Sequence, residues 1–545
     1  MSVEETVREA QGAPSVTEVE GPITPVEPGG PGVPGAREPS SGEGPEPSSP
    51  PIAGEPGAPP DDLVTRLLSA ATYLRESFAD AVARDLLWPS LVAMGPLWQV
   101  DASRLLQHAR RARAARRARD RRLAAVLGCL LLTVLVWGAL SLSHPMSPIA
   151  GAFLALLLVG WVYCCAVALA ARHYLSARRS ALLAFYGPDD TDRDIEPASL
   201  DLAVKELNEA NVVFAEAESS PFLGSGSEID HWALTIDLSR GVSSPAGPGA
   251  RTHQREHKQP DPFTGADLQE YLLRAVPEVV QPRPAAGHRL HVRGGTTAPV
   301  VDLFRSGPTG TDLVDAMRFR RPVARVSPEV IQRYLDEPNE VARIYTYFQH
   351  SAWGGQVVIT LFVRALVSNR TLFVEGRVYA LRPLIGRFYE VRGLSQRPWV
   401  ELTDVLRQAR ANAIPLLFAS PGRVRRALQN PLRPIEVRRI EREITGRRDL
   451  DFGANHTLRE QFAARYDPGD HFPAIDERMY HQIFNRRVLE CIGEFLTARN
   501  IDTVEFAHQQ ASIVNRAVYL GDLYGPLNRS GQPGEVPPPG ADPGD

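Results

Sequence analysis

The chain has 545 residues, 47 prolines and a formal net charge of −4 at neutral pH. Its length allows two or three domains of ~100–200 residues each. Its four cysteines lack the spacing of a zinc site or of a disulfide framework. Arginine supplies all but two of the 60 basic residues, so an arginine at a given position does not by itself indicate specific recognition.

Residues 1–62 are rich in proline, glycine, serine and glutamate. Fourteen of the 47 prolines lie here, and twelve acidic residues accompany only Arg8 and Arg37. Such a segment buries too little apolar surface to offset its chain entropy, so we expect a disordered acidic tail. The acidic start and the lack of an early apolar run argue against a signal peptide.

Residues 63–122 are predicted to form a cytosolic helical region. Apolar residues over 62–88 recur on one face of an amphipathic helix, which ends before Pro89. A second helix is predicted to begin near Asp101–Ser103 and to continue into the next segment. We expect the apolar stretch between the two helices to pack on the cytosolic domain rather than to lie in the lipid interface.

Two uncharged runs follow, 123–143 and 149–171. Each has about 20 residues, enough to cross the ~30 Å hydrocarbon core of a bilayer. The connection SHPMSP is short and carries no lysine or arginine, which predicts a transmembrane α-helical hairpin over 123–171 with both termini in the cytoplasm. Neither run has an Asp, Glu, Lys, Arg or His side chain, which argues against a transport pathway. We therefore predict a multi-pass protein of the cell (inner) membrane.

The stretch RRARAARRARDRR at 110–122 directly precedes the first run. Its arginines fall on nearly every helical face, unlike the stripe of a helix that reads a DNA groove, so we expect no nucleic-acid partner. Anionic headgroups attract basic residues near the bilayer by ~1 kcal/mol each. The arginines predicted to contact lipid and to set the topology are Arg110, Arg111, Arg113, Arg116, Arg117, Arg119, Arg121 and Arg122, with Arg172, Arg178 and Arg179 after the second run.

Residues 181–527 are predicted to form a cytosolic α+β domain whose sheet is mixed and largely antiparallel. Alternating apolar residues over 232–238 predict a half-buried strand. Three β-branched and aromatic segments within 342–391 are separated by turn residues at Gly354–Gly355 and Ser368–Asn369. They predict an antiparallel meander.

Helices are expected around this sheet. Thr264 is the predicted N-cap of one, and residues 401–428 are predicted to be helical. An amphipathic helix is predicted over 476–499, with one face made of Met479, Ile483, Val488, Ile492 and Phe495. Residues 513–531 suggest a short strand, and residues 528–545 a second disordered tail.

The stretch FLGSGS at 222–227 has the glycine content of a phosphate-cradling loop. Such a loop runs from a strand into a helix N-terminus. These glycines precede another predicted strand, so a turn is the better interpretation. A small-molecule or peptide contact stays open, and its candidate residues are Ser220, Phe222, Gly224, Ser225 and Gly226. No catalytic residue, metal ligand or cofactor is assigned.

Several stretches carry a family resemblance, among them TYLRESFADAVARDLLWPSL, NVVFAEAESSPFLGSGSEIDHWALTIDLSRG and LDFGANHTLREQFA. On these residues the chain resembles a group of actinobacterial two-span membrane proteins with a large cytosolic domain, whose function is unknown. The likeness covers residues 70–520. It implies the two-span topology and an actinobacterial source, and it supplies no activity and no catalytic residues.

These patterns predict a membrane-tethered binding or scaffold module more readily than an enzyme. The expected partners are a bilayer with anionic headgroups and an unidentified protein. Small residues at Gly151, Ala155, Gly160 and Cys164 suit packing within the hairpin or a homo-oligomer. One alternative is a membrane-bound hydrolase-type enzyme, which requires several neighbouring acids and histidines to converge, drawn from His231, His288, His291, His350 and His471. Another is an oligomeric membrane effector whose hairpins form a pore.

Overall fold

The structure is a computed structural model that describes residues 62–87, 92–143, 147–187, 204, 206–244, 256–295, 303–305, 321–394, 398–429, 451–464 and 471–523. The two predicted disordered tails and residues 144–146 of the hairpin connection lie outside the described residues, apart from Asp62. The chain divides into two units, Met1–Pro56 and Gly57–Asp545. All the elements below belong to the second unit.

The first described helices are α1 (Leu63–Leu74) and α2 (Glu76–Leu87). The prediction of one continuous helix here was wrong, because Arg75 adopts an extended backbone (φ −120°, ψ 111°) between them. The break lets the two helices pack on different neighbours. α1 is buried on most sides, whereas Phe78 of α2 packs edge-on against Phe388 and Phe462, with ring centroids 5.0 and 5.3 Å away.

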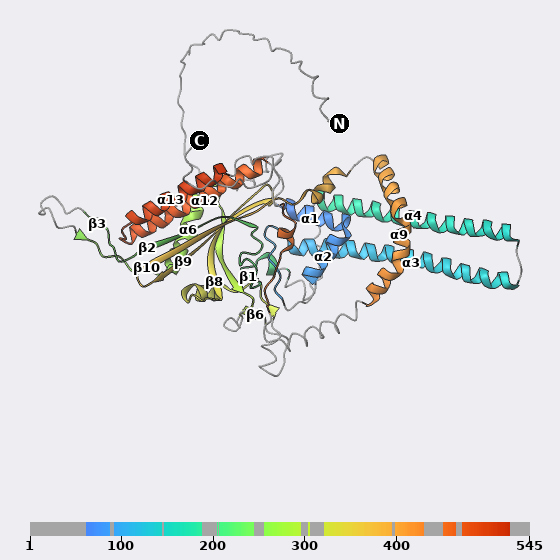
Figure 1. Ribbon diagram of the computed structural model, residues 1–545, viewed down its shortest axis with the longest axis horizontal. Helices are drawn as coiled ribbons and strands as arrows, with labels where there is room; N and C mark the ends of the chain where they lie inside the picture. The colour runs from blue at the N-terminus through green and yellow to red at the C-terminus, as the bar shows by residue number, and fades with distance from the viewer. Residues whose placement is uncertain are drawn as a thin grey trace, which may run out of the picture. The chain divides into compact units, whose positions relative to one another are not determined.

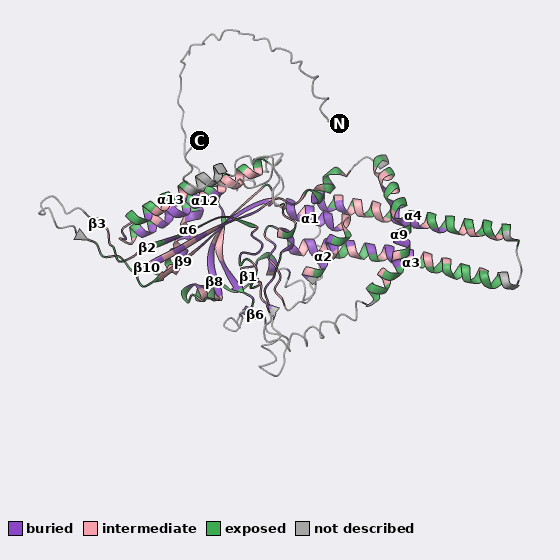
Figure 2. Ribbon diagram, viewed as in Figure 1, coloured by how far each residue is buried: buried purple, intermediate pink, exposed green. Residues whose placement is uncertain are grey.

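Two long helices follow, α3 (Ala102–Ser143) and α4 (Pro148–Tyr186). The prediction that the basic helix continues into the first uncharged run is confirmed. The Asp101 carboxylate accepts the N–H groups of Ser103 and Arg104, which caps α3. Both helices are long and apolar enough to cross a membrane. Their distal parts expose mainly apolar side chains, as Figure 2 shows in green.

The sheet has six strands: β1 (Val212–Ala215), β5 (Ala285–Arg293), β8 (Ala342–Ala352), β9 (Val357–Ser368), β10 (Thr371–Leu381) and β2 (Ser227–Asp237), in that spatial order (Figure 1). Only β1 and β5 are parallel, so the predicted mixed, largely antiparallel sheet is confirmed. The meander turns lie where predicted, with positive φ at Gly354, Gly355 and Asn369.

Three helices cover one face of this sheet: α6 (Gly265–Val279), α12 (His471–Ala498) and α13 (Val504–Leu523). The predicted N-cap of α6 is confirmed, because Thr264 and Asp267 form a reciprocal capping box. On α12, however, Met479 is 41% exposed, while Phe484 and Val488 enter the core. The short strand predicted near residue 513 was wrong, because α13 packs Phe506 and Ile513 into the same core.

Shorter elements complete the described chain. They are the strand pair β3 (Ser243–Ser244) and β4 (Glu256–His257), the pair β6 (Phe304–Arg305) and β7 (Arg321–Pro322), the helices α8 (Pro328–Asp336) and α11 (Leu458–Gln461), and the 3-10 helix η3 (Gly386–Gly393). The segment before α3 packs on the sheet side of the molecule, as predicted. There Trp98 stacks on the buried Arg289 of β5, whose guanidinium carbon lies 3.6 Å from the ring centroid.

A last long helix, α9 (Pro398–Gln429), contains Pro415 and Pro421. Figure 1 shows α9 running across α3 and α4 rather than along them. Its buried residues Val405, Ala409 and Ala413 share one apolar cluster with Leu123 of α3 and with α4. The helix that follows the meander in sequence therefore packs on the apolar hairpin.

Candidate functional site

A cavity of about 470 Å³ lies between α1, α3 and α4. Helix α3 presents Arg104, His108 and Arg111 to the cavity at intervals of four and three residues, which places them on one face, and Arg116 follows five residues later. None of the described residues that line it is acidic. The lining residues are Tyr73, Arg104, His108, Arg111, Ala112, Ala115, Arg116, His173, Ser176, Ala177, Ser180, Leu183, Ala184 and Gly187.

Arg116 is a buried cation of this cavity, only 6% exposed. Its Nη2 donates to the backbone carbonyls of Thr72 (2.5 Å) and Tyr73 (3.1 Å) at the end of α1. Its Nη1 is buried and has no hydrogen-bonding partner in the part of the chain that the structure describes. A buried guanidinium N–H without an acceptor costs free energy, so Arg116 is suited to an anion.

His108 is the second buried polar group, 4% exposed. Its Nδ1 lies 3.1 Å from the hydroxyl of Tyr73, and its Nε2 has no partner among the described residues. Burial, assisted by Arg104 and Arg111, lowers the pKa of His108 to about 4. The ring is therefore neutral at pH 7. When the Tyr73 hydroxyl donates to Nδ1, the ring proton is on Nε2, which becomes a second donor without an acceptor.

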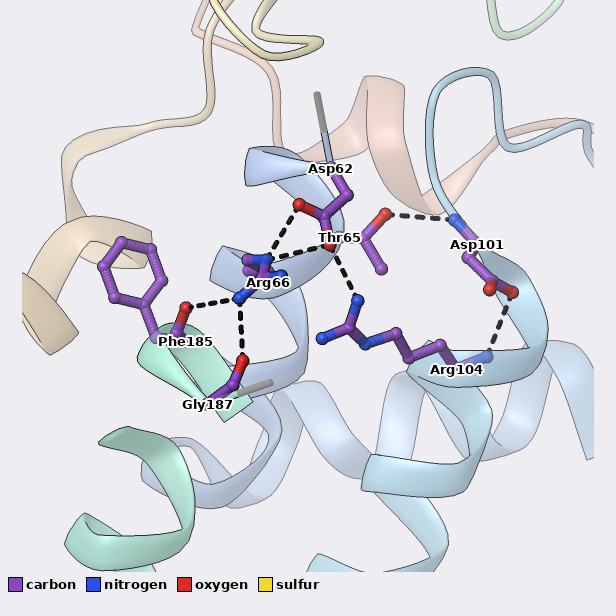
Figure 3. A network of polar contacts seen from close by, with 7 residues as sticks. All are labelled: Asp62, Thr65, Arg66, Asp101, Arg104, Phe185 and Gly187. Carbon is purple, nitrogen blue, oxygen red and sulfur yellow. Dashed lines mark hydrogen bonds and ion pairs between the residues drawn. The ribbon is translucent and has the colours of Figure 1, made fainter. Parts of the chain in front are cut away.

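A polar network lies beside the cavity and includes two of its lining residues, Arg104 and Gly187 (Figure 3). The carboxylate of Asp62 binds Arg66 (2.8 Å) and Arg104 (2.7 Å). Arg66 also donates from Nη1 to the carbonyls of Phe185 (3.2 Å) and Gly187 (2.9 Å). These two carbonyls lie at the C-terminal end of α4, where Gly187 is the C-cap. The network therefore fixes the distance between α1, α3 and the end of α4, and with it the shape of the cavity.

The structure divides the predicted topology arginines into two groups. Four are buried or half-buried and bind within the protein: Arg113 with Asp80 (2.9 Å), Arg116 with α1, Arg119 with Asp120 (2.8 Å), and Arg178 with the carbonyl of Glu401 (3.5 Å). The others are exposed: Arg110, Arg111, Arg117, Arg121, Arg122, Arg172 and Arg179. One of them, Arg121, donates to the carbonyl of Arg117 (3.4 Å). Headgroup contact stays a prediction for this exposed group.

Sequence reasoning missed the cavity because it treated the basic stretch as one patch. The available signal was the spacing of Arg104, His108 and Arg111 by four and three residues, which places these three side chains on one helical face. What could not be read from that spacing is the identity of the helices that cover this face. Tyr73 comes from α1 and His173 from α4, far away along the chain.

The candidate ligand loop is largely a packing element. Phe222 is 2% exposed and enters an aromatic cluster with Tyr345, Phe362 and Tyr379. Gly224 and Gly226 adopt φ of +86° and +90°. A Cβ on Gly226 would lie 2.2 Å from the carbonyl oxygen of Ala380, so the loop approaches β10 too closely for a side chain there.

The remaining loop residues differ in exposure. Ser225 is 3% exposed and its N–H donates to the carbonyl of Phe222 (3.1 Å). Ser220 is exposed. The loop leads into β2, as the turn interpretation predicted. Packing accounts for four of the five candidate residues, and neither the cavity under α1 nor a smaller one beside α11 is lined by them.

The acids and histidines considered for a hydrolase lie apart among the described residues. Asp230 pairs with His481 of α12 (2.9 Å) rather than with its neighbour His231, which lies 2.9 Å from Glu228. Asn485 donates to the same Asp230 oxygen, so this buried pair is tied into the core. No group of three histidine, cysteine or acidic side chains in the described part of the chain could hold a metal ion.

A family model described as an AbeC-like domain matches residues 231–525, more than half of the chain. The chain belongs to the AbeC-like family. The AbeC-like domain starts within β2, includes the meander, α9 and α12, and ends just after α13. Helices α1 to α4, with the cavity, precede it. No curated protein and no solved structure matches the chain.

Proposed function

We propose that this AbeC-like protein is a membrane-tethered binding module. Helices α3 and α4 anchor it in the cell membrane with both termini in the cytoplasm. The cavity between α1, α3 and α4 binds a phosphate-class anion on the cytosolic side. The AbeC-like domain is thereby held close to the membrane, where it meets its protein partner.

The observation that carries the anion proposal is the pair of buried donors in an arginine-rich cavity. Nη1 of Arg116 and Nε2 of His108 each lack an acceptor among the described residues. Both residues line the same cavity, together with Arg104 and Arg111. Phosphate oxygens accept several hydrogen bonds at once and are favoured by guanidinium groups.

Membrane insertion is supported by the surface of α3 and α4. Leu135 is 71% exposed, Leu156 71% and Ile149 83%. A soluble protein rarely exposes so continuous an apolar surface. Arginines flank the hairpin only on the side of the cavity, which supports a cytoplasmic location for that side.

The position of the cavity favours a soluble phosphate ester over a lipid headgroup. Arg116 precedes Leu123, where the uncharged run begins, by seven residues, a helical rise of about 10 Å. His108 precedes it by fifteen, a rise of about 22 Å. The headgroup layer on each side of a bilayer is only about 5–8 Å thick. Both buried donors therefore lie beyond the headgroup layer, on its cytosolic side.

Binding can be tested on the full-length protein in phosphatidylcholine nanodiscs. Isothermal titration calorimetry measures the affinity for the soluble anions, inorganic phosphate and pyrophosphate. Native mass spectrometry of the protein released from phosphatidylglycerol nanodiscs detects a lipid that stays bound. We expect pyrophosphate to bind and Arg111→Gln to weaken it by about tenfold, the value of a charged hydrogen bond. Arg110→Gln is the matched control, since it removes the same charge outside the cavity lining, and it should change affinity less than twofold.

The outcomes separate the two sources. Retention of phosphatidylglycerol that Arg111→Gln abolishes, without pyrophosphate binding, supports the phosphate site and identifies a headgroup as its ligand. Equal behaviour of Arg111→Gln, Arg110→Gln and wild type toward both ligands overturns the proposal.

A further inference from the structure

Helix α9 has an uncharged centre between charged ends, of which the second is basic. Residues 413–422 carry no charge, while Glu401, Asp404, Arg407 and Arg410 precede them and Arg423, Arg425 and Arg426 follow. This centre includes three of the residues that lie on the apolar hairpin, Ala413, Leu416 and Leu417. A helix with this distribution resembles neither a span, which is uncharged throughout, nor an ordinary surface helix.

Several large apolar side chains of α9 are exposed. Ile414 is 54% exposed, Phe418 67%, Leu428 71% and Val400 45%. Packing among the described residues does not account for these side chains, because the buried face of α9 is formed by other positions, including Val405, Ala409, Ala413, Leu416 and Leu417. The helix therefore has one apolar face toward the hairpin and apolar residues directed away from it.

The depth at which α9 meets the hairpin is set by its contacts. On α3 the shared cluster reaches from Leu123 to Leu130, and on α4 from Leu175 to Val162, of which Ala171 to Val162 lies in the uncharged run. At 1.5 Å per residue the parts within the uncharged runs correspond to about 10 and 14 Å of helix. Helix α9 therefore covers the cytosolic end of both uncharged runs.

The uncovered remainder of the hairpin is too short to cross a bilayer alone. From Leu131 to Ser143, and from Ile149 to Trp161, each helix has 13 residues, or about 20 Å. The hydrocarbon core is about 30 Å thick. The missing ~10 Å equals the depth that α9 covers, so a hairpin that spans the core places α9 within the cytosolic leaflet.

Polar contacts of α9 are directed toward the cytosolic helices. Arg423 binds Glu76 (3.4 Å) and lies 3.9 Å from Asp120, and Arg178 donates to the carbonyl of Glu401 (3.5 Å). Apolar surface with basic residues at its margins is typical of a helix that lies in the plane of a membrane, where long side chains reach the headgroups.

The backbone of α9 is adapted to an apolar environment at Pro421. This proline has no N–H to donate to the carbonyl of Leu417. The hydroxyl of Ser420, which is fully buried, donates to that carbonyl instead (2.7 Å). A carbonyl in a lipid leaflet needs such an internal partner, because no water is present to supply one.

We propose that α9 is an in-plane membrane helix, immersed in the acyl chains of the cytosolic leaflet with Ile414, Phe418 and Leu428 against lipid. The AbeC-like domain thus contributes a membrane contact of its own, beyond the hairpin that precedes it. This inference rests on the proposed insertion of α3 and α4.

Photolabelling tests the proposal without altering the protein. The wild-type full-length chain is placed in nanodiscs that contain a phospholipid with a diazirine near the end of an acyl chain, and labelled peptides are mapped by mass spectrometry. We expect label in α3, in α4 and in residues 411–428 of α9, and none in α12 or α13, although Phe472 of α12 is 73% exposed.

Phe418→Glu should lower the α9 label at least fivefold while the label on α3 and α4 persists, and Phe472→Glu, the matched control, should change neither. If α3 and α4 are labelled but wild-type α9 is not, the proposal of an in-plane helix is wrong, while the proposed insertion of α3 and α4 still holds. Unlabelled spans would instead overturn the insertion on which both proposals rest. An α9 that is protected from lipid and crosslinks to a second copy would show a protein contact and refute the inference.

Discussion

At the scale of single residues, position decides what an arginine does in this protein. Arg116 and Arg119 are buried and Arg110 is exposed, although all three belong to one basic stretch. Arg459 is 1% exposed and donates to the carbonyls of Gln356 (3.0 Å) and Arg382 (2.8 Å). Burial lowers the pKa of Arg459 to about 10, and it stays charged at pH 7. Buried guanidinium groups thus join chain segments through backbone carbonyls.

His108 gives a prediction at this scale. Its pKa in the folded state, about 4, lies below the usual 6.5 because the ring is buried beside Tyr73, Arg104 and Arg111. The unfolded chain therefore binds more protons between pH 6.5 and 4. The stability contributed by neutral His108 is present above pH 6.5 and is lost as the pH falls toward 4, by at most roughly 3 kcal/mol.

His108→Asn keeps a polar atom near the Tyr73 hydroxyl and removes the titration. We expect the melting temperature of the variant to fall less between pH 7 and pH 5 than that of the wild type, measured by differential scanning fluorimetry in nanodiscs. Parallel pH profiles for the two proteins would contradict the assignment of this effect to His108.

At the scale of elements, partner surfaces shape each strand and helix. Gly376 of β10 lies beneath the indole of Trp232 of β2, and a Cβ there would approach the ring to 2.2 Å. Because Gly376 has no side chain, the indole of Trp232 can lie flat on β10. Its N–H then donates to Asn485 (3.0 Å), which connects β2 to α12.

Gly376→Ala should therefore destabilise the AbeC-like domain by about 1–3 kcal/mol, because the added methyl must displace a packed ring. Gly386→Ala is the matched control, since a Cβ at Gly386 has no neighbour within 4 Å. Urea unfolding followed by tryptophan fluorescence measures the difference. Equal midpoints for the two variants would show that Trp232 can move without cost.

At the scale of the whole molecule, the chain couples an apolar hairpin to a sheet domain through α9 and the short helices α1 and α2. The proposed topology puts both termini on one side. A reporter fused after Asp545 should be active only in the cytosol, and a cysteine introduced at Met146 should react with an impermeant maleimide added from outside. The parent protein, whose cysteines include Cys129 and Cys164 in the hairpin, is the control. Labelling of Met146→Cys only after lysis would invert the topology.

Local patterns in the sequence determined most of the architecture. Alternation predicted β2, turn residues predicted the meander, and two uncharged runs predicted the apolar hairpin. Each of these signals depends on neighbouring residues, whose spacing matches the period of a strand or of a helix. The N-cap at Thr264 was predicted for the same reason.

Tertiary structure decided what depends on distant partners. The break at Arg75, the helical state of α13 and the exposure of Met479 follow from which surfaces meet in the fold, and local propensity indicated the opposite. The cavity needs α1 and α4 beside α3, and the position of α9 needs the hairpin that precedes it by more than 200 residues. Contacts between segments far apart in sequence leave no local period, so only the folded chain reveals them.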